Sequence, residues 1–274
     1  MTADEFLASV VADLADHSYP DYIKDSPSNI AESVRQHAVV VVEGDEQETD
    51  GELPVGCSKV GGCPDLPTDL AWPTEHDGQP LAFIAQLDLA EVAPADLGDQ
   101  LPKAGMLWVF SIADGDRAYG YEIDDSTTKL LYRADPGPLA RQDIPADLAD
   151  DEDAAIGEYR LRFGPALCLT EVDEEEGVIE SKRYDGSIET AIDKAAAKYG
   201  GCSGAIRLLG HAHFFREENQ EDFDIETDVV LLAIDGYAIA QHAFGEGELC
   251  WLISKKALAE SQLETAWQVF EPGT

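Results

Sequence analysis

Short apolar segments with the spacing of β-strands dominate this 274-residue sequence. Residues 80–89, PLAFIAQLDL, alternate in polarity, which predicts a strand with one apolar face. That face would carry Leu81, Phe83, Ala85, Leu87 and Leu89, with Gln86 and Asp88 opposite. Residues 105–112, GMLWVFSI, are apolar throughout and predict a strand covered on both sides. Because strands need partners, the chain is expected to fold around a sheet.

Two later segments repeat the order of these two. DVVLLAIDGY begins at Asp228 and EGELCWLIS at Glu246, and Gly210 precedes Val229 by the same interval, 19 residues, by which Gly62 precedes Leu81. We therefore predict an α+β fold in which two related β-rich halves, an internal duplication, pack as one unit with a few flanking helices. The predicted parts of this single 1–274 unit are an N-terminal helical segment at 1–28, halves at 29–135 and 187–270, and an acidic connection at 136–186.

Three segments have helix signals. Thr2 and Glu5 have the spacing of a capping box before a helical apolar stripe, which predicts a helix over 3–15. Asn29 and Glu32 repeat that spacing before a second helix, which is followed by a strand at 39–42. Residues 187–201 begin with a serine, are rich in alanine and end in two glycines, which predicts a third helix.

The segment SKVGGCPDLPTDLAWP, residues 58–73, predicts a stiff, shaped loop. Its Gly61-Gly62 pair suits backbone with positive φ, and its prolines fix φ near −65° around the bend. We expect the loop to close over the sheet of the first half with Trp72 as its apolar anchor. Since loops on rigid scaffolds often carry function, a ligand-lining role for Trp72 is the alternative.

The chain is strongly acidic. Eighteen basic residues against 56 acidic ones give a formal net charge of −38. This charge disfavours nucleic acid and anionic membranes and favours a basic protein partner. Part of the acid is clustered at 143–153, 171–180 and 217–228, although a solvated surface adapted to salt would also explain it.

Cysteine usage and the N-terminus predict a cytoplasmic protein. The five cysteines are an odd number without CxxC spacing, which fits a reducing compartment. The N-terminal residues are acidic where a signal peptide would be basic, and no apolar run is long enough to span a membrane.

No catalytic residue, metal or cofactor is predicted. Three weak patterns would suit a zinc site, a cysteine nucleophile and a calcium site. Their residues would be His211, His213 and His242 for zinc; Cys63 with His76 for the nucleophile; and Asp222, Asp224, Glu226 and Asp228 for calcium. None has the spacing of an established motif, so loop and surface roles are the preferred interpretation.

The order of several segments resembles the YwqG-like family, a bacterial domain family of unknown function. The likeness lies in SKVGGCPDLPTDLAWP, GQPLAFIAQLDLAEV, LPKAGMLWVFSI, RLLGHAHFF, DVVLLAIDG and GEGELCWLISKKALAESQLETAWQVFE. The resemblance implies a cytoplasmic, internally duplicated α+β protein without an agreed activity, and its association with toxin and immunity gene clusters suggests an immunity-like role. The chain departs from the family at Gly210, which is followed by His211 instead of the usual Gly-x-Pro.

The leading hypothesis is a non-enzymatic binding protein that docks a basic partner through acidic loops, including Asp222, Asp224 and Glu226. The alternative is an enzyme or small-ligand protein with a cleft between the halves. Its floor would be Gln86 and Asp88, and its lid residues 61–73 with Trp72. The sequence leaves the oligomeric state open.

Overall fold

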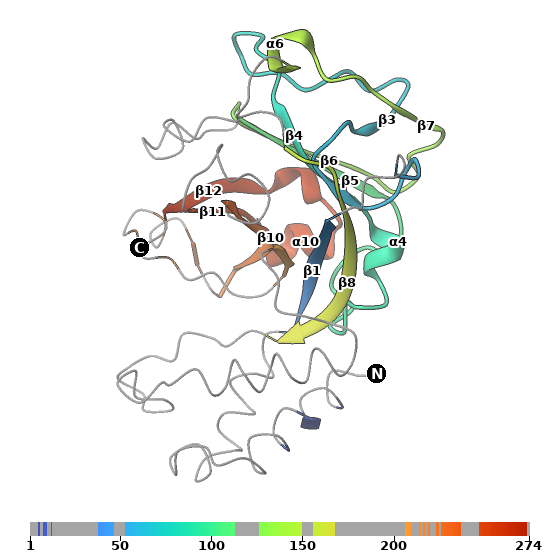
Figure 1. Ribbon diagram of the computed structural model, residues 1–274. Helices are drawn as coiled ribbons and strands as arrows, with labels where there is room; N and C mark the ends of the chain where they lie inside the picture. The colour runs from blue at the N-terminus through green and yellow to red at the C-terminus, as the bar shows by residue number, and fades with distance from the viewer. Residues whose placement is uncertain are drawn as a thin grey trace.

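The structure is a computed structural model that describes residues 38–46, 53–112, 126–149, 156–167, 206–209, 226–236, 247–272 and a few single positions (Figure 1). Glu5, Ala8, Ser9 and Ala12 are helical. The remainder of the predicted first helix, the helix after Asn29 and the helix at 187–201 lie outside the described residues.

A ten-stranded sheet organises the described residues. Its order is β12-β11-β10-β9-β1-β8-β2-β4-β5-β6, and every adjacent pair is antiparallel. The strands are β1 (Ala38–Glu46), β2 (Lys59–Val60), β4 (Ala82–Asp88), β5 (Met106–Ser111), β6 (Thr128–Arg133), β8 (Tyr159–Leu167), β9 (Ile206–Leu208), β10 (Asp228–Asp235), β11 (Gly247–Ser254) and β12 (Trp267–Pro272). The predicted strands at 39–42, 80–89 and 105–112 and in the two later segments are confirmed.

The remaining elements are short. β3 (Asp65–Pro67) and β7 (Leu139–Arg141) form a two-stranded antiparallel sheet. The helices in the described residues are α4 (Leu89–Val92), α6 (Ala146–Ala149), α10 (Lys255–Ala259) and the 3₁₀ turn η2 (Leu263–Thr265). The described part of the chain is therefore mostly β with three short α-helices.

The two ends of the large sheet have similar layouts on either side of β1 and β8 (Figure 1). One end runs β2-β4-β5-β6 and the other β9-β10-β11-β12, and both β4 and β10 contain a bulge. β8, in the middle of the sheet, lies within the 136–186 range that was predicted as a connection. The likeness of the two ends is one of strand order, and an internal duplication stays a prediction.

The bulge in β4 corrects the prediction of a single apolar face. The register shifts between Phe83 and Ala85, so the alternation reverses there. Leu81 and Phe83 pack in an outer cluster with Trp108, whereas Ala85 and Leu87 pack in the main core. Periodicity alone cannot reveal this reversal, because all these side chains are apolar.

The sheet curls so that its two ends meet around the main core. The Trp251 indole N–H on β11 donates to Thr128 Oγ1 on β6 over 2.8 Å, and Ser111 Oγ on β5 lies 2.9 Å from Gln268 Oε1 on β12. Between the ends, buried aliphatic residues of both form one apolar cluster. Burying this cluster is what holds the two ends together.

Candidate functional site

The segment after β2 bends sharply at Gly61 and Gly62, within the shaped loop that the sequence predicts. Gly61 and Gly62 have φ of +63° and +66°. A Cβ on Gly61 would lie 2.2 Å from the carbonyl oxygen of Gly157, so only glycine fits there. The Gly61 N–H donates to Ile84 O and the Gly62 N–H to Ile156 O, which ties the bend to β4 and to the segment before β8.

Trp72 anchors the loop on the outer face of the sheet. Its indole N–H donates to Leu81 O over 2.8 Å, and its ring meets Phe110 edge to face with centroids 5.5 Å apart. It packs against the outer apolar cluster, which includes Leu66 and Trp108. The predicted role as an apolar anchor is thereby explained by contacts, and a ligand-lining role stays a prediction.

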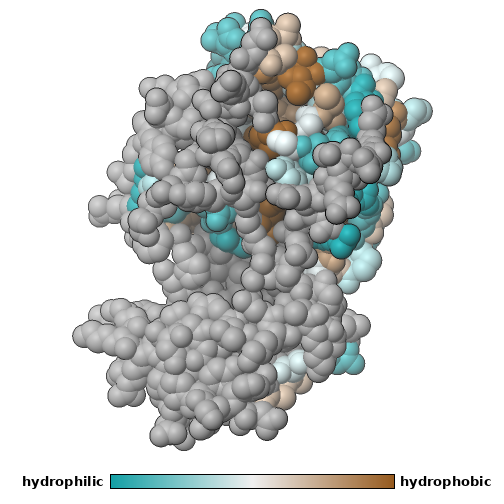
Figure 2. All heavy atoms as spheres, in the orientation of Figure 1, coloured by the Kyte–Doolittle hydropathy of each residue, from teal (hydrophilic) through white to brown (hydrophobic). Residues whose placement is uncertain are grey.

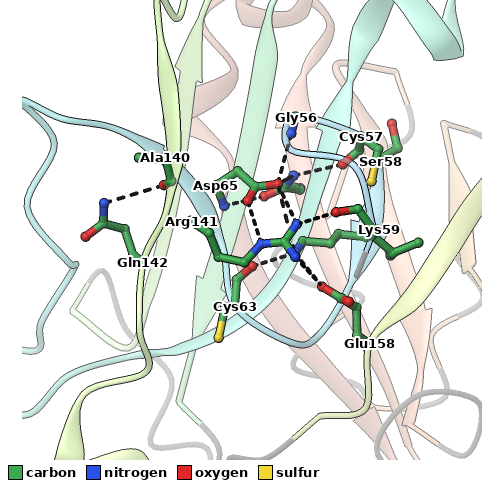
Figure 3. A network of polar contacts seen from close by, with 12 residues as sticks. Gly56, Cys57, Ser58, Lys59, Cys63, Asp65, Ala140, Arg141, Gln142 and Glu158 are labelled. Atoms are coloured by element: carbon green, nitrogen blue, oxygen red, sulfur yellow. Dashed lines mark hydrogen bonds and ion pairs between the residues drawn. The ribbon is translucent and has the colours of Figure 1, made fainter. Parts of the chain in front are cut away.

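Beneath the loop, Asp65 on β3 is fully buried and satisfied (Figure 3). Its carboxylate accepts hydrogen bonds from the Gly56 N–H, from Gln86 Nε2 and from Arg141 Nε, each over 2.9 Å. Its own N–H donates to Gln86 Oε1 over 2.8 Å. Burial opposes ionisation of this carboxyl, but the three donors and the nearby Lys59 outweigh burial and lower the pKa of Asp65.

Lys59 on β2 is buried at the centre of the same network. Its Nζ donates to Cys63 O over 2.5 Å and to Glu158 Oε1 over 2.6 Å, and lies 4.0 Å from Asp65 Oδ2. Figure 3 shows the side chains of Lys59, Arg141 and Glu158 pointing toward one another. The Lys59 side chain is 0% exposed and that of Glu158 is 27% exposed, so the network runs from the core to the surface.

A second ion pair continues the network toward α4. Arg160 on β8 donates to Glu91 Oε1 over 2.5 Å, and Glu91 Oε2 accepts the Ser58 N–H over 3.0 Å. The neighbouring thiol of Cys57 is buried, and burial raises its pKa against the opposing effect of Arg160. A thiol with a raised pKa is a poor nucleophile at neutral pH.

This network of hydrogen bonds and ion pairs is suited to holding the loop in position. Lys59 and Arg141 are each held by carboxylates, and Gln86 uses both ends of its amide within the network. Charges fixed in this way hold three distant segments, 56–65, 141 and 158, in one arrangement. The network therefore gives the loop a single shape.

Comparison with known families now places the chain. A family model described as "Domain of unknown function (DUF1963)" matches residues 58–271. The chain belongs to this family. The match to this DUF1963 protein begins at Ser58, the first residue of the shaped segment, and includes β2 to β12. A search among curated proteins found no match. In the described residues, no helix is long and apolar enough to cross a membrane.

The structure places the predicted cleft residues of the DUF1963 protein in different settings. Gln86 is fully buried in the network below the loop, and Asp88 is half-buried and caps α4 through the Ala90 N–H. Trp72 lies over the same outer face as Gln86. Between the two ends of the sheet the structure places an apolar cluster, together with the polar contacts of Thr128, Ser111 and Gln268.

Of the predicted acidic site, Asp224 and Glu226 are described and exposed, and Asp222 lies outside the described residues. Asp224 Oδ1 accepts the Glu226 N–H over 2.9 Å, and Asp228 Oδ2 accepts the Asp224 N–H over 3.1 Å. These two contacts order the turn before β10. The zinc candidates His211, His213 and His242 lie outside the described residues. The described residues contain no group of three or more histidine, cysteine or acidic side chains that could hold a metal ion.

Sequence reasoning missed Lys59, Asp65, Arg141 and Glu158. Lys59 had a weak signal, because it lies two residues before the Gly61-Gly62 pair in a chain with only 18 basic residues. Arg141 and Glu158 had none, since their partners are 76 and 99 residues away.

Proposed function

We propose that this DUF1963 protein is a non-enzymatic binding protein that docks a basic protein partner through its acidic loops. The resemblance to the YwqG-like family extends the proposal to an immunity-like role, in which the partner is a basic protein that the complex neutralises. Opposite charge would speed the encounter and select the partner.

The proposal rests on the excess of acidic side chains over the basic side chains that could pair with them. In the part of the chain that the structure describes, basic side chains pair with carboxylates of the same chain, among them Lys59, Lys103, Arg133, Arg141, Arg160 and Arg207. With 56 acidic and 18 basic residues, at least 56 − 18 = 38 acidic side chains have no basic counterpart within the chain. A basic protein partner would offset part of this excess negative charge where it binds.

The surface supports docking over a cleft. In the face shown in Figure 2, hydrophilic residues cover much of the described area, with only small apolar patches among them. Val55, 56% exposed, is the large apolar side chain that stands out in the described part of the chain. The space between the sheet ends is occupied by core residues where it is described.

The test reverses charge inside and outside an acidic run. Asp222→Lys with Glu226→Lys changes the 217–228 run and leaves Asp224, which orders the turn, in place. Glu260→Lys with Glu264→Lys makes the same change in net charge at exposed positions around η2. The probe is the basic protein cytochrome c, with association rates measured by stopped-flow at low and high salt.

We expect the first pair to slow association on the order of tenfold at low salt, since a unit charge pair at 4 Å in water is worth about 1 kcal/mol. The dependence on salt should flatten with it. The Glu260 and Glu264 pair should have a clearly smaller effect. Equal effects of both pairs would show that only net charge matters and would refute docking through this loop.

A further inference from the structure

One turn presents an apolar side chain to solvent. The Cys57 N–H donates to Pro54 O over 3.3 Å, and Gly56, the third residue of the turn, has a φ of +83°, as a type II turn requires. The second residue of the turn is Val55, which is 56% exposed. Leu53 and Cys57, on either side, are each only 5% exposed. The turn therefore directs Val55 outward while the residues that flank the turn stay buried.

The polar network below the loop fixes this turn. The carboxylate of Asp65 accepts the Gly56 N–H over 2.9 Å, and Arg141 holds the same carboxylate (Figure 3). Arg141 Nη2 also donates to Leu53 O over 2.9 Å. The backbone on both sides of Val55 is thus tied to buried or half-buried charged groups. A side chain on backbone that is already ordered loses less conformational freedom when it binds a partner.

Val55 adjoins further apolar surface. Gly56, the next residue, lies against β7, because a Cβ at Gly56 would be 3.3 Å from Leu139 Cδ1. Leu139 is half-buried and packs against the outer apolar cluster. A single exposed valine on a surface needs no explanation, but a valine held in place next to a half-buried leucine forms an apolar contact surface of the kind that anchors a partner.

Negative charge lies next to this apolar surface. The acidic run 143–153 begins two residues after β7 and contains six acidic and no basic residues. Asp143 and Asp147 of this run are described and exposed. The charge of Arg141, at the end of β7, is offset by Asp65 over 2.9 Å. A partner that covers the apolar surface would therefore meet negative charge beside it, and lysine or arginine would complement that charge.

We propose that Val55 and Leu139 form the apolar contact of the docking surface and bind a segment of the basic protein partner in which an apolar side chain is flanked by lysine or arginine. The apolar side chain would pack on Val55, and the flanking cations would face the 143–153 run. This inference rests on the proposed function and specifies the kind of segment that the partner contributes. Charge would govern the rate of encounter, and the apolar contact the lifetime of the complex.

The test uses the full chain with ¹³C-labelled valine methyl groups and ¹⁵N-labelled backbone, and the peptide KKLLKK as the probe. The peptide KKSSKK has the same charge without the apolar centre. Val55→Ser removes the apolar side chain, and Ala71→Ser, at an exposed position of the shaped loop, is the control. Dissociation constants are measured by NMR titration, and folding is checked by thermal unfolding.

We expect KKLLKK to shift the Val55 methyl signals and to bind Val55→Ser about three- to tenfold more weakly than the wild type, since the contact buries part of one valine. Its binding to Ala71→Ser should be unchanged within about 1.5-fold. KKSSKK should bind the wild type and Val55→Ser equally. Val55→Ile enlarges the contact and should bind KKLLKK at least as tightly as the wild type. Because Val55 is exposed, both Val55 variants should unfold at the temperature of the wild type.

Equal binding of KKLLKK to Val55→Ser and Ala71→Ser would overturn the inference. Val55 methyl signals that stay in place while KKLLKK binds would overturn it as well. If the wild type forms a dimer that Val55→Ser abolishes, the turn is a contact between two copies of this chain, and the inference is again wrong.

The two proposals fail separately. If the charge reversals at residues 222 and 226 slow association while Val55→Ser leaves KKLLKK binding unchanged, docking through the 217–228 run stands and the apolar contact falls. If the reversals have no specific effect but Val55→Ser weakens KKLLKK binding, the apolar contact stands without that run.

Discussion

Replacing Lys59 by methionine should destabilise the DUF1963 protein by about 3 kcal/mol. Lys59→Met keeps the length and apolar stem of the side chain and removes the ammonium group, which donates to Cys63 O and Glu158 Oε1. Removing one partner of a buried ion pair costs about 3–5 kcal/mol. The lower end applies because Glu158 is 27% exposed and regains water, and because Asp65 keeps its bond to Arg141.

The assay is urea unfolding followed by tryptophan fluorescence. With a slope of about 2–3 kcal/mol per molar urea, the midpoint should fall by about 1 M or more. Lys103→Met is the matched control, because Lys103 also pairs with carboxylates but is 49% exposed, and its loss should cost under about 1 kcal/mol.

A double-mutant cycle with Glu158→Gln isolates the pair. If the two residues act together, the double variant should be less destabilised than the sum of the single ones, by about 1–3 kcal/mol. A loss below about 1 kcal/mol in Lys59→Met would refute the reasoning, because desolvation of the ammonium would then cancel its attraction.

Two further predictions concern the same loop. Gly61→Ala should cost well over 1 kcal/mol, because its φ is +63° and the new Cβ would lie 2.2 Å from Gly157 O, whereas Gly78→Ala, at φ +92° with open space, should cost about 1 kcal/mol; equal midpoints in urea would contradict this. The lowered pKa of Asp65 means that its ionised form stabilises the fold fully above the unfolded pKa of about 3.9, and that this contribution is lost as pH falls through the lower folded pKa. Wild-type stability should therefore fall more steeply than that of Asp65→Asn between about pH 4 and 2, and parallel curves would remove Asp65 as the cause.

Local patterns predicted the strands well, because a strand shows in the sequence as alternating or continuous apolar residues. GMLWVFSI predicted β5, whose six residues are all buried, and the two later segments predicted β10 and β11. The bend at Gly61-Gly62 in the shaped loop was also predictable, since backbone with positive φ favours glycine.

The candidate sites were less predictable, because they depend on register. Gln86 was expected on the floor of a cleft. In the structure it follows the bulge in β4, and it is buried in a polar network in which the Asp65 N–H donates to its Oε1. The sequence does not predict that Asp235, Glu248 and Glu271 lie opposite one another, since only the pairing of β10, β11 and β12 brings them together.

The sequence by itself determined that this chain forms strands, that a stiff loop follows Ser58 and that the surface is acidic, because each depends on neighbouring residues or on simple counts. Only the tertiary structure decided which charges meet. Lys59 pairs with Glu158, and Glu248 pairs with Arg207 and lies opposite Glu271. The partners are far apart in the chain. The energy of such contacts depends on burial and distance, and both are fixed only when the sheet closes around its core.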